Sequence, residues 1–305
     1  MDVLVVNAGS TSLKLHLVRG DAAEAVDGFV AADAVGHRVV HGGRRFEEPT
    51  LITEPVELAI EELSALAPLH NRRALDEICR AREALPDVPH VAVFDTAFHR
   101  TMPAAAATYA IPARWREEWG VHRYGFHGIS VQWVASQVEA ERLVVCHLGG
   151  GCSVTAVRSG RSVDTTMGFS PLEGVPMATR SGSVDPGAIV YLLRAGHLGV
   201  DELERSLEHE SGLAGLSAGS GDIRQASPLA LDVFVHGVAS AVAAMATSCG
   251  GMGVLAFTGG IGENAKNVRE RIVERVRFLG DFRVEVVPSR EELVIAAETR
   301  RLLGS

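Results

Sequence analysis

Lysine is almost missing from this chain of 305 residues, in which Lys14 and Lys266 are the only two among 29 lysines and arginines. A Walker A loop needs Gly-Lys followed by Ser or Thr, and neither lysine has that setting. The protein-kinase strings HRD and DFG and the dinucleotide string GxGxxG are missing as well. The standard nucleotide-binding motifs are therefore excluded.

An excess of basic charge is also lacking, because 38 acidic residues outweigh the 29 basic ones and give a formal net charge of −9. A nucleic-acid-binding protein needs a basic face that displaces counterions from phosphates. We therefore expect no nucleic-acid partner. Apolar residues make up 47% and charged residues 22%, which is ordinary for a soluble globular protein.

Cysteine pairs with redox or metal-ligand spacing are absent, since none of the four cysteines belongs to a CxxC motif. Free thiols are typical of a reducing compartment, and the N-terminal MDVLVV lacks the basic region of a signal peptide, so we expect a cytoplasmic protein. One charge-free run, from Val233 to Phe257, is long enough to cross a membrane. Breaks at Gly250, Gly251 and Gly253 instead predict a buried helix, a turn and a buried strand, and no membrane partner.

Short apolar runs are present at four places, and each ends in a polar or glycine-rich segment at Asn7, Asp95, His147 or Thr258. Such runs, with helical patterns between them, predict buried strands in mixed α/β layers. At about 150 residues per domain, the length suggests two domains. Helices are predicted over 56–67, 72–85, 130–141, 187–195, 229–247, 269–279 and 291–303.

A faint internal repeat supports two related halves. The strings VVNAGSTS at 5–12 and VCHLGGGCS at 145–153 align at an offset of 140 residues. Each has an apolar strand, a polar residue, a glycine-containing turn and an alternating run, so each predicts a tight β-hairpin with exposed backbone N–H groups. We expect two related lobes that each present one hairpin to a shared cleft.

Glycine, serine and threonine gather in five clusters, at 7–12, 147–151, 179–183, 217–222 and 258–264. Small residues allow a ligand to approach the backbone, and exposed amides in a turn form an anion-binding nest. Any one cluster is more often a simple turn. Five of them at strand ends favour a phosphate-rich ligand, namely a nucleotide.

Charged residues flank these clusters, and the candidates are Arg38, Asp95, His127 and Arg180. Phosphoryl transfer needs cations around the transferring group and a metal ion held by oxygen ligands. Taken singly, such residues are more often surface ion pairs, turn residues or caps. The HxxxH spacing that begins at His37 lacks further ligands, so we predict no zinc site there.

In chain order, the motifs resemble those of acetate kinase and its short-chain acyl kinase relatives. The resemblance covers nearly the whole chain and rests on NAGSTSLK, HRVVHGG, APLHN, VFDTAFH, RYGFHG, HLGGGCS, DTTMGFSPLEGVPMATRSG, DIR, FTGGIGEN and EELVIA. It implies a two-lobed, actin-like ATPase (ribonuclease H-like) fold with a duplicated βββαβαβα core and a nucleotide cleft between the lobes. The N-terminal lobe would be 1–97 plus 292–305, and the C-terminal lobe 98–291.

The resemblance also implies a function: reversible, ATP-dependent phosphorylation of acetate to acetyl phosphate by a cytoplasmic homodimer with ATP/ADP and Mg²⁺ or Mn²⁺. Arg38 would bind the substrate carboxylate, while Arg180 and His127 would stabilise the transferring phosphoryl group. A carboxylate is already ionised at neutral pH and needs no strong base as a nucleophile. Asp95 would therefore orient the metal ion or an arginine, with acid/base catalysis as the weaker alternative.

Further roles follow for matching positions. Asn7 and Glu291 would hold the metal ion. The wall of the small acyl pocket would be Val40, Leu69, Phe126 and Pro171. ATP would contact Lys14, His147, Leu148, Gly149, Gly150, Gly151, Asp222, Ile223, Arg224, Gly260, Ile261, Gly262, Glu263 and Asn264.

Two departures from the family pattern leave alternatives open. Gly150 stands where the family usually has Asn, so one side-chain contact to phosphate would be lost, and the chain is short between Val18 and His37 and between Leu279 and Glu291. The alternatives are a propionate or butyrate kinase and a trimmed relative that binds nucleotide but transfers nothing. A sugar kinase is disfavoured, because the acyl-kinase strings contradict it.

Overall fold

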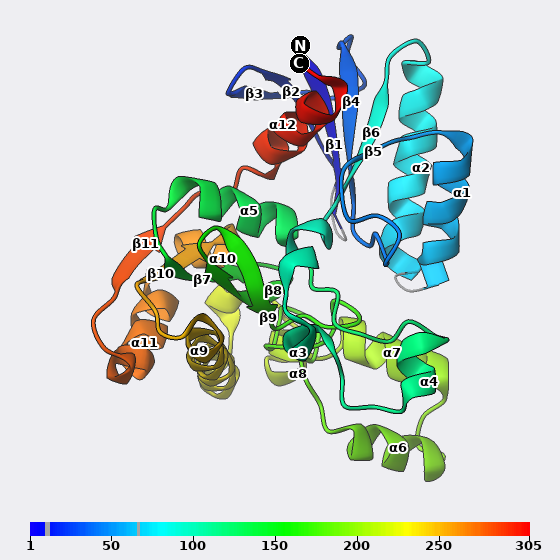
Figure 1. Cartoon of the computed structure of the whole chain (residues 1–305). Helices are drawn as coiled ribbons and strands as arrows, with labels where there is room; N and C mark the ends of the chain where they lie inside the picture. The colour runs from blue at the N-terminus through cyan, green and yellow to red at the C-terminus, as the bar shows by residue number, and fades with distance from the viewer. Residues whose placement is uncertain (10–12, 66–67) are drawn as a thin grey trace. The chain divides into compact units, whose positions relative to one another are not determined.

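The computed structural model describes residues 1–9, 13–65 and 68–305, without the side chains of 65 and 68–70. The chain divides into two compact units (Figure 1). Unit 1 contains residues 1–100, 126–133 and 290–305, and unit 2 contains 101–125 and 134–289. The lobes expected from the sequence change at 97/98 and 291/292, so the structure differs by a few residues at both points and also assigns 126–133 to unit 1.

Unit 1 is built on a mixed sheet with the strand order β3-β2-β1-β4-β6-β5. Strand β1 is antiparallel to β2 and parallel to β4, which is in turn parallel to β6. The strands are β1 (Val3–Ala8), β2 (Leu13–Arg19), β3 (Ala22–Ala25), β4 (Ala34–Val39), β5 (Thr50–Leu51) and β6 (His90–Phe94). The helices are α1 (Glu54–Glu62), η1 (Leu63–Ala65), α2 (Pro68–Ala84), η2 (Ala97–Thr101), the first part of α5 (Gly128–Gln137) and α12 (Glu291–Leu303).

Both faces of the unit 1 sheet are covered by helices. Val3 and Val5 of β1 pack in a core cluster with α12, whereas Leu4 and Val6 pack on the opposite face in a cluster with α2. Successive side chains of a strand point to opposite faces, so a strand covered on both faces must be apolar throughout. This explains why the first strand reads VLVV without alternation.

Unit 2 repeats this topology. Its sheet has the order β11-β10-β7-β8-β9, in which β7 is antiparallel to β8 and parallel to β10. The strands are β7 (Arg142–Leu148), β8 (Cys152–Arg158), β9 (Arg161–Thr165), β10 (Val254–Thr258) and β11 (Arg283–Val286). Strands β1, β2, β3, β4 and β6 thus correspond to β7, β8, β9, β10 and β11, which agrees with the repeat at an offset of 140 residues. The duplicated sheet is confirmed. Unit 1 lacks the helix that the expected βββαβαβα order places between its third and fourth strands, because β3 is followed directly by β4.

Helices α9 and α10 pack against this sheet, and α9 is its long core helix. The helices of unit 2 are α3 (Ala104–Ala107), α4 (Ala113–Glu117), the end of α5, α6 (Pro186–Arg194), α7 (Val200–His209), α8 (Gly212–Leu216), η3 (Ile223–Gln225), α9 (Pro228–Cys249), α10 (Gly259–Asn264), α11 (Lys266–Val276) and η4 (Arg277–Leu279). The short helices α3, α4, α7, α8 and α10 were not predicted from the sequence. Of these, α10 falls in the glycine cluster at 258–264.

Helix α9 carries most of the long charge-free run, and among the described residues it alone passes a length and hydropathy test for a membrane span. Its buried residues recur three or four positions apart, as at Phe234, Val238 and Val242, while Asp232 and His236 are exposed. The buried face packs against β7 and β8. Helix α9 therefore has the pattern of a core helix, followed by a glycine cap at Gly250 and the buried strand β10, as predicted.

Candidate active site

Arg38 is the centre of a polar cluster in unit 1. It lies near the end of β4, and its guanidinium donates from Nε (3.0 Å) and Nη2 (2.5 Å) to Oδ2 of Asp95, just beyond β6. Strands β4 and β6 are parallel neighbours, so the residues at their carboxyl ends come together. The Arg38 side chain is 13% exposed and that of Asp95 only 1%. A pair this buried is held rigidly, because separating it would leave an uncompensated charge.

Asn7 and Glu291 complete the cluster. Asn7, at the end of β1, accepts from Arg38 Nη1 through Oδ1 at 3.2 Å and donates from Nδ2 to Glu291 Oε2 at 2.8 Å. Glu291 begins α12, and its Oε2 lies 3.8 Å from Arg38 Nη1. Two predicted metal ligands and two predicted catalytic residues are therefore in one connected group within unit 1. The structure places Glu291 in unit 1. The boundary expected from the sequence had made it the last residue of the C-terminal lobe.

The electrostatics of the cluster keep Arg38 charged. Burial by itself lowers the pKa of the Arg38 guanidinium, but Asp95 and Glu291 more than offset this effect and raise it above its ordinary value. Burial raises the pKa of Asp95, and the neighbouring Glu291 adds to that shift, while Arg38 opposes it by favouring the carboxylate. The result is a guanidinium that stays charged and is fixed between two carboxyl groups.

Asn7 and Glu291 fit a magnesium site by the chemistry of their donor atoms. Mg²⁺ prefers oxygen ligands, keeps several waters and is usually bound by only one or two carboxylates. Asn7 supplies an amide oxygen, which accepts from Arg38, and Glu291 supplies a carboxylate, which accepts from the Asn7 amide nitrogen. The described residues contain no group of three or more His, Cys, Asp or Glu arranged for a metal ion. Water would therefore have to fill most of the coordination shell.

His127 lies at the start of α5, in a left-handed backbone conformation with φ of 58°. The next residue, Gly128, donates its N–H to the Asp95 carbonyl at 2.9 Å, and a Cβ at that position would overlap this carbonyl. His99 Nε2 also donates to the Phe126 carbonyl at 2.9 Å. These contacts attach residues 126–133 to unit 1 and hold His127 beside the Asp95 segment.

The predicted acyl-pocket residues divide between the units. Val40 and Phe126 are buried in unit 1, where the Phe126 ring meets His41 edge-on with centroids 5.3 Å apart. Pro171 is buried in unit 2. The side chain of Leu69 lies outside the described residues, as do the turn residues 10–12 of the first hairpin.

Arg180 lies in unit 2, on the loop between β9 and α6. Its Nε donates to Glu208 Oε2 at 2.7 Å, and both side chains are nearly buried. Thr179 Oγ1 donates to the Glu208 carbonyl, and the amide of Ser211 donates to the Thr179 carbonyl. Helix α7 thus holds both Arg180 and its loop. Glu208 was missed in the sequence because its helix was missed; the spacing of Leu203 and Leu207 and the acidic first turn were the available signals.

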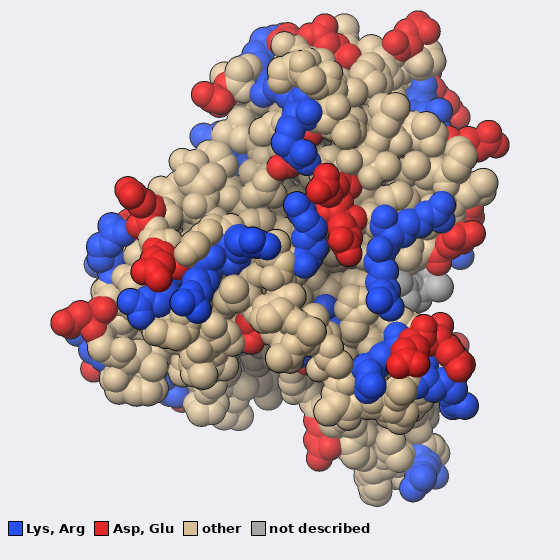
Figure 2. All heavy atoms as spheres, viewed as in Figure 1, with Lys and Arg blue, Asp and Glu red and all other residues tan. Residues whose placement is uncertain are grey.

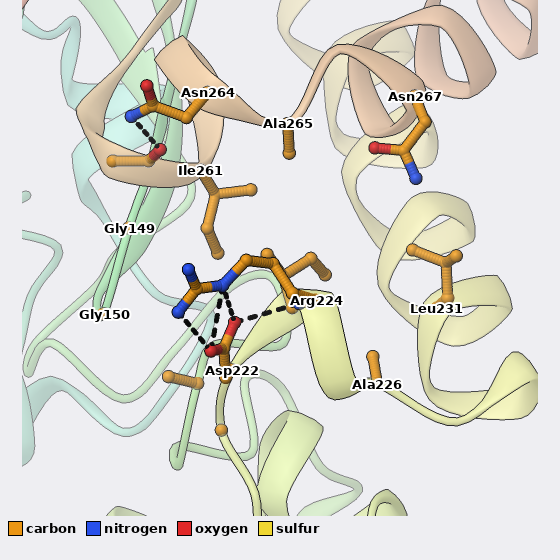
Figure 3. Close-up of a pocket in the computed structure, with 14 residues that line it drawn as sticks. Gly149, Gly150, Asp222, Arg224, Ala226, Leu231, Ile261, Asn264, Ala265 and Asn267 are labelled. Atoms are coloured by element: carbon orange, nitrogen blue, oxygen red, sulfur yellow. Dashed lines mark hydrogen bonds and ion pairs between the residues drawn. The ribbon is translucent and has the colours of Figure 1, made fainter.

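A pocket of about 610 Å³ in unit 2 is lined by residues from three of the five glycine clusters, those at 147–151, 217–222 and 258–264 (Figure 3). Of the residues predicted to contact ATP, those that line it are Gly149, Gly150, Asp222, Ile223, Arg224, Gly260, Ile261 and Asn264. It is also lined by Gly221, from the cluster at 217–222, and by five residues that the sequence did not indicate: Ala178, Ala226, Leu231, Ala265 and Asn267. The lining is mostly apolar with a few polar groups, as is usual for small-molecule sites.

Asp222 and Arg224 form the polar side of this pocket. Arg224 donates to the Asp222 carboxylate from Nε (2.9 and 3.0 Å) and Nη2 (2.6 Å), so its planar guanidinium lies over the pocket (Figure 3). These hydrogen bonds lower the pKa of Asp222 to about 2. The Arg224 guanidinium presents a flat face of the kind that stacks on a ring.

The remaining predicted ATP contacts lie elsewhere. Leu148 is fully buried at the end of β7, and Gly262 is buried within α10. Lys14 is exposed on β2 of unit 1, where it is the register partner of Asn7. The others outside the pocket lining are His147, Gly151 and Glu263.

Comparison with known proteins gives the family. The model of the Acetokinase family matches residues 29–299. A curated relative from Synechococcus sp. (strain JA-2-3B'a(2-13)), named acetate kinase, is 50% identical over 264 residues. The chain belongs to the acetokinase family. The family resemblance inferred from the motifs is thereby confirmed.

The length of the chain and the solved structures similar to it add detail to this family assignment. The matched region is 81% of this chain but 65% of the Synechococcus relative, so the chain spans about two thirds of that relative's length. A propionate kinase from Francisella tularensis is 32% identical, with a TM-score of 0.90 over 97% of this chain and 98% of that one. An acetate kinase from Porphyromonas gingivalis is 30% identical, with a TM-score of 0.89 over 99% of both chains. The predicted actin-like α/β fold class is confirmed.

Proposed function

We propose that the protein phosphorylates acetate reversibly, converting ATP and acetate to ADP and acetyl phosphate. The observation that carries this proposal is the buried cluster of Arg38, Asp95, Asn7 and Glu291 in a chain of the acetokinase family. A charged guanidinium braced by a carboxylate, beside oxygen ligands for a divalent ion, suits a reaction between two anions. The pocket in unit 2 supplies the second requirement, a site of suitable size for a nucleotide.

The proposed chemistry needs no proton transfer. A carboxylate oxygen of acetate attacks the γ-phosphorus of ATP, the bond from that phosphorus to the β,γ-bridging oxygen breaks, and ADP leaves with the electron pair. The obstacle is repulsion between the two anions, which fixed cations reduce. Arg38 binds the acetate carboxylate, while Arg180 and His127 stabilise charge on the transferring phosphoryl group.

Asp95 acts in this scheme as a positioning group for Arg38. Its Oδ2 accepts two hydrogen bonds from the guanidinium and is buried, so it is well placed to fix the cation and poorly placed to exchange protons with solvent. Asn7 and Glu291 would hold Mg²⁺ or Mn²⁺, which supplies charge neutralisation at the phosphates.

The expected cellular location, partners and oligomeric state belong to the same proposal. A cytoplasmic location is supported by four free cysteines, and the absence of a nucleic-acid role by the net charge of −9 and by the mixture of basic and acidic side chains on the face in Figure 2. A homodimer is supported by the exposed apolar side chains of α6, Val190 and Leu193. Size-exclusion chromatography with light scattering tests the dimer.

The assay for the activity uses MgATP, hydroxylamine and acetate, propionate or butyrate, with the acyl phosphate trapped as its hydroxamate. We expect product with acetate at the highest kcat/KM. The propionate kinase among the similar structures supports propionate as the alternative substrate, and a higher kcat/KM with propionate would favour it. No hydroxamate with any of the three acids would overturn the proposal in favour of a nucleotide-binding protein without transfer.

Variants at the two arginines test the assigned roles. Arg38→Ala and Arg180→Ala should each lower kcat by about 10²–10³-fold, the usual effect of removing one electrostatic stabiliser, while ATP binding by calorimetry changes little. Arg38→Lys should recover only part of the activity, because it keeps the charge but loses the planar fork. The controls are Arg45→Ala and Arg205→Ala, whose side chains are 59% and 57% exposed. Near-normal turnover in both alanine variants would remove these arginines from the site.

A further inference from the structure

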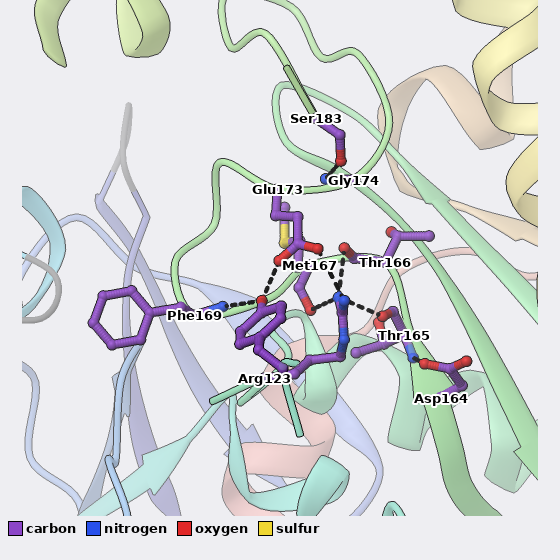
Figure 4. A network of polar contacts seen from close by, with 10 residues as sticks. Arg123, Asp164, Thr165, Thr166, Met167, Phe169, Glu173, Gly174 and Ser183 are labelled. Carbon is purple, nitrogen blue, oxygen red and sulfur yellow. Dashed lines mark hydrogen bonds and ion pairs between the residues drawn. The ribbon is translucent and has the colours of Figure 1, made fainter. Parts of the chain in front are cut away.

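Arg123 organises a polar network in unit 2 that the proposed mechanism does not use. Its Nη1 lies within hydrogen-bond distance of three successive carbonyls, those of Thr165 (3.2 Å), Thr166 (3.1 Å) and Met167 (3.3 Å), and its Nη2 donates to Glu173 Oε1 at 2.9 Å (Figure 4). The side chain is 17% exposed. One guanidinium thus joins the beginning and the end of residues 164–174, which we name the wall segment.

Tyr109 ties the middle of the wall segment to the same carboxylate. The amide of Phe169 donates to the Tyr109 hydroxyl at 3.0 Å, and the hydroxyl donates its own proton to Glu173 Oε2. The Arg123 guanidinium lies over the Tyr109 ring, 5.2 Å from its centroid. Burial, followed by the hydrogen bond to Glu173, raises the pKa of Tyr109 and keeps this donor protonated.

The backbone at Gly168 packs closely against the Tyr109 hydroxyl and the Glu173 carboxylate. A Cβ at Gly168 would overlap both the Glu173 carboxylate and the Tyr109 hydroxyl. The Gly168 carbonyl also accepts from the amide of Tyr124 at 3.0 Å. The backbone of the wall segment therefore lies directly against the Tyr109–Glu173 pair and cannot shift without breaking it.

The wall segment carries Pro171, the residue of unit 2 assigned to the acyl pocket. It lies on the same β9–α6 connection as Arg180, and the two parts are tied together, because the Gly174 amide donates to Ser183 Oγ at 3.1 Å and the Ser183 amide donates to the Gly174 carbonyl at 2.9 Å. Movement of the wall segment would therefore displace both Pro171 and the part of the loop that carries Arg180.

We propose that Tyr109, Arg123 and Glu173 are positioning residues that set acyl-chain preference by fixing the wall segment. This role rests on the proposed function, since it presumes that Pro171 limits the acyl group. A pocket distinguishes one methylene by only about 10–200-fold even when its walls are rigid. If the wall segment were mobile, the pocket would accept propionate more readily, and the preference for acetate over propionate would fall.

The test compares Tyr109→Phe and Glu173→Gln with wild type. Each removes one polar atom or one charge without changing side-chain size. The matched controls are Tyr191→Phe, at a side chain that is 63% exposed, and Glu202→Gln, on the exposed face of α7. Two measurements are made on the full chain: kcat and KM for acetate, propionate and ATP, and amide hydrogen exchange across 164–174 without substrates.

In both test variants, the ratio of kcat/KM for acetate over propionate should fall about threefold to tenfold, the usual effect of one lost hydrogen bond, while KM for ATP stays within about twofold. Exchange in 164–174 should rise, and the controls should match wild type. An unchanged acid ratio in both variants overturns the proposal, whether or not exchange rises, and so does a uniform loss of kcat with all acids. If wild type itself phosphorylates none of the acids, the proposed function fails. The exchange measurement then still decides whether the three residues hold the segment.

Discussion

At the scale of single residues, Arg38 and Arg180 are each fixed by a carboxylate. Asp95 accepts from Nε and Nη2 of Arg38, and Glu208 accepts from Nε of Arg180. A fixed cation loses little freedom when an anion arrives, and a charge-assisted hydrogen bond is roughly twice as strong as a neutral one. Each arginine is therefore oriented before its proposed ligand binds.

Glu208 offers a test of this orientation. Glu208→Ala should lower kcat about tenfold, because Arg180 loses a charge-assisted hydrogen bond and with it a defined position. Glu208→Gln should lose less, since an amide oxygen still accepts from Nε. Steady-state kinetics with acetate and MgATP measure both effects, with Glu204→Ala on the exposed face of α7 as the control. A Glu208→Ala enzyme with the kcat of wild type would contradict the role of Glu208.

At the scale of elements, the second hairpin shows how a strand pair shapes a site. Strands β7 and β8 are joined by Gly149–Gly151, and two of these glycines line the pocket of unit 2. Hydrogen bonds between the strands fix the turn, so its backbone amides are presented in one arrangement. The wall segment illustrates the reverse case, because beyond the end of β9 it has no regular structure and side chains from other segments fix it.

Gly150 can be tested within this hairpin. A Cβ at Gly150 would meet no atom within 4 Å, and its φ is not in the left-handed region. Gly150→Asn, which restores the residue usual in the family pattern, should therefore fold normally and add one donor for a phosphate oxygen. We expect KM for ATP to fall about threefold to tenfold, measured in the hydroxamate assay. Gly28→Asn, also in open space, is the control. An unchanged or higher KM for ATP would show that the amide makes no such contact.

At the scale of the whole molecule, buried histidines make stability depend on pH. Burial lowers the pKa of His99 to about 4, and it also lowers the pKa of His37 and of His90, which hydrogen-bond to each other at 2.9 Å. Below the unfolded value of about 6.5, the unfolded chain binds protons that the folded chain does not. Stability should be complete above pH 6.5 and should fall as the pH drops towards the folded pKa values.

Urea unfolding between pH 8 and pH 5 measures this dependence. We expect the free energy of unfolding to decrease below pH 6.5 by about 1.4 kcal/mol per pH unit for each buried histidine. In His99→Gln, the free energy of unfolding should fall less steeply with pH, because the unfolding reaction takes up one proton fewer. In His209→Gln, at an exposed position, the pH dependence should match wild type. A flat profile from pH 8 to pH 5 would contradict the neutral, buried state of these rings.

Much of the fold could be predicted from the sequence, because strands and helices depend on patterns of neighbouring residues along the chain. Runs such as VLVV identify strands covered on both faces, and the repeat at 140 residues identifies the duplicated sheet. The helix α12 begins and ends at the predicted residues, Glu291 and Leu303. Helix α7 was missed although Val200, Leu203 and Leu207 recur at helical spacing and its first turn is acidic. Helix α10 was missed because glycine dominates it.

The sequence by itself determined the strands, the repeat, the family and the residue types of the candidate site, because each depends on neighbours along the chain or on long motifs. Only the tertiary structure decided which carboxylate holds which arginine. Glu291 is 284 positions from its partner Asn7, Glu208 is 28 from Arg180, and Tyr109 is 60 from Phe169. Contacts at such separations are made by sheet register and helix packing, which no local pattern encodes.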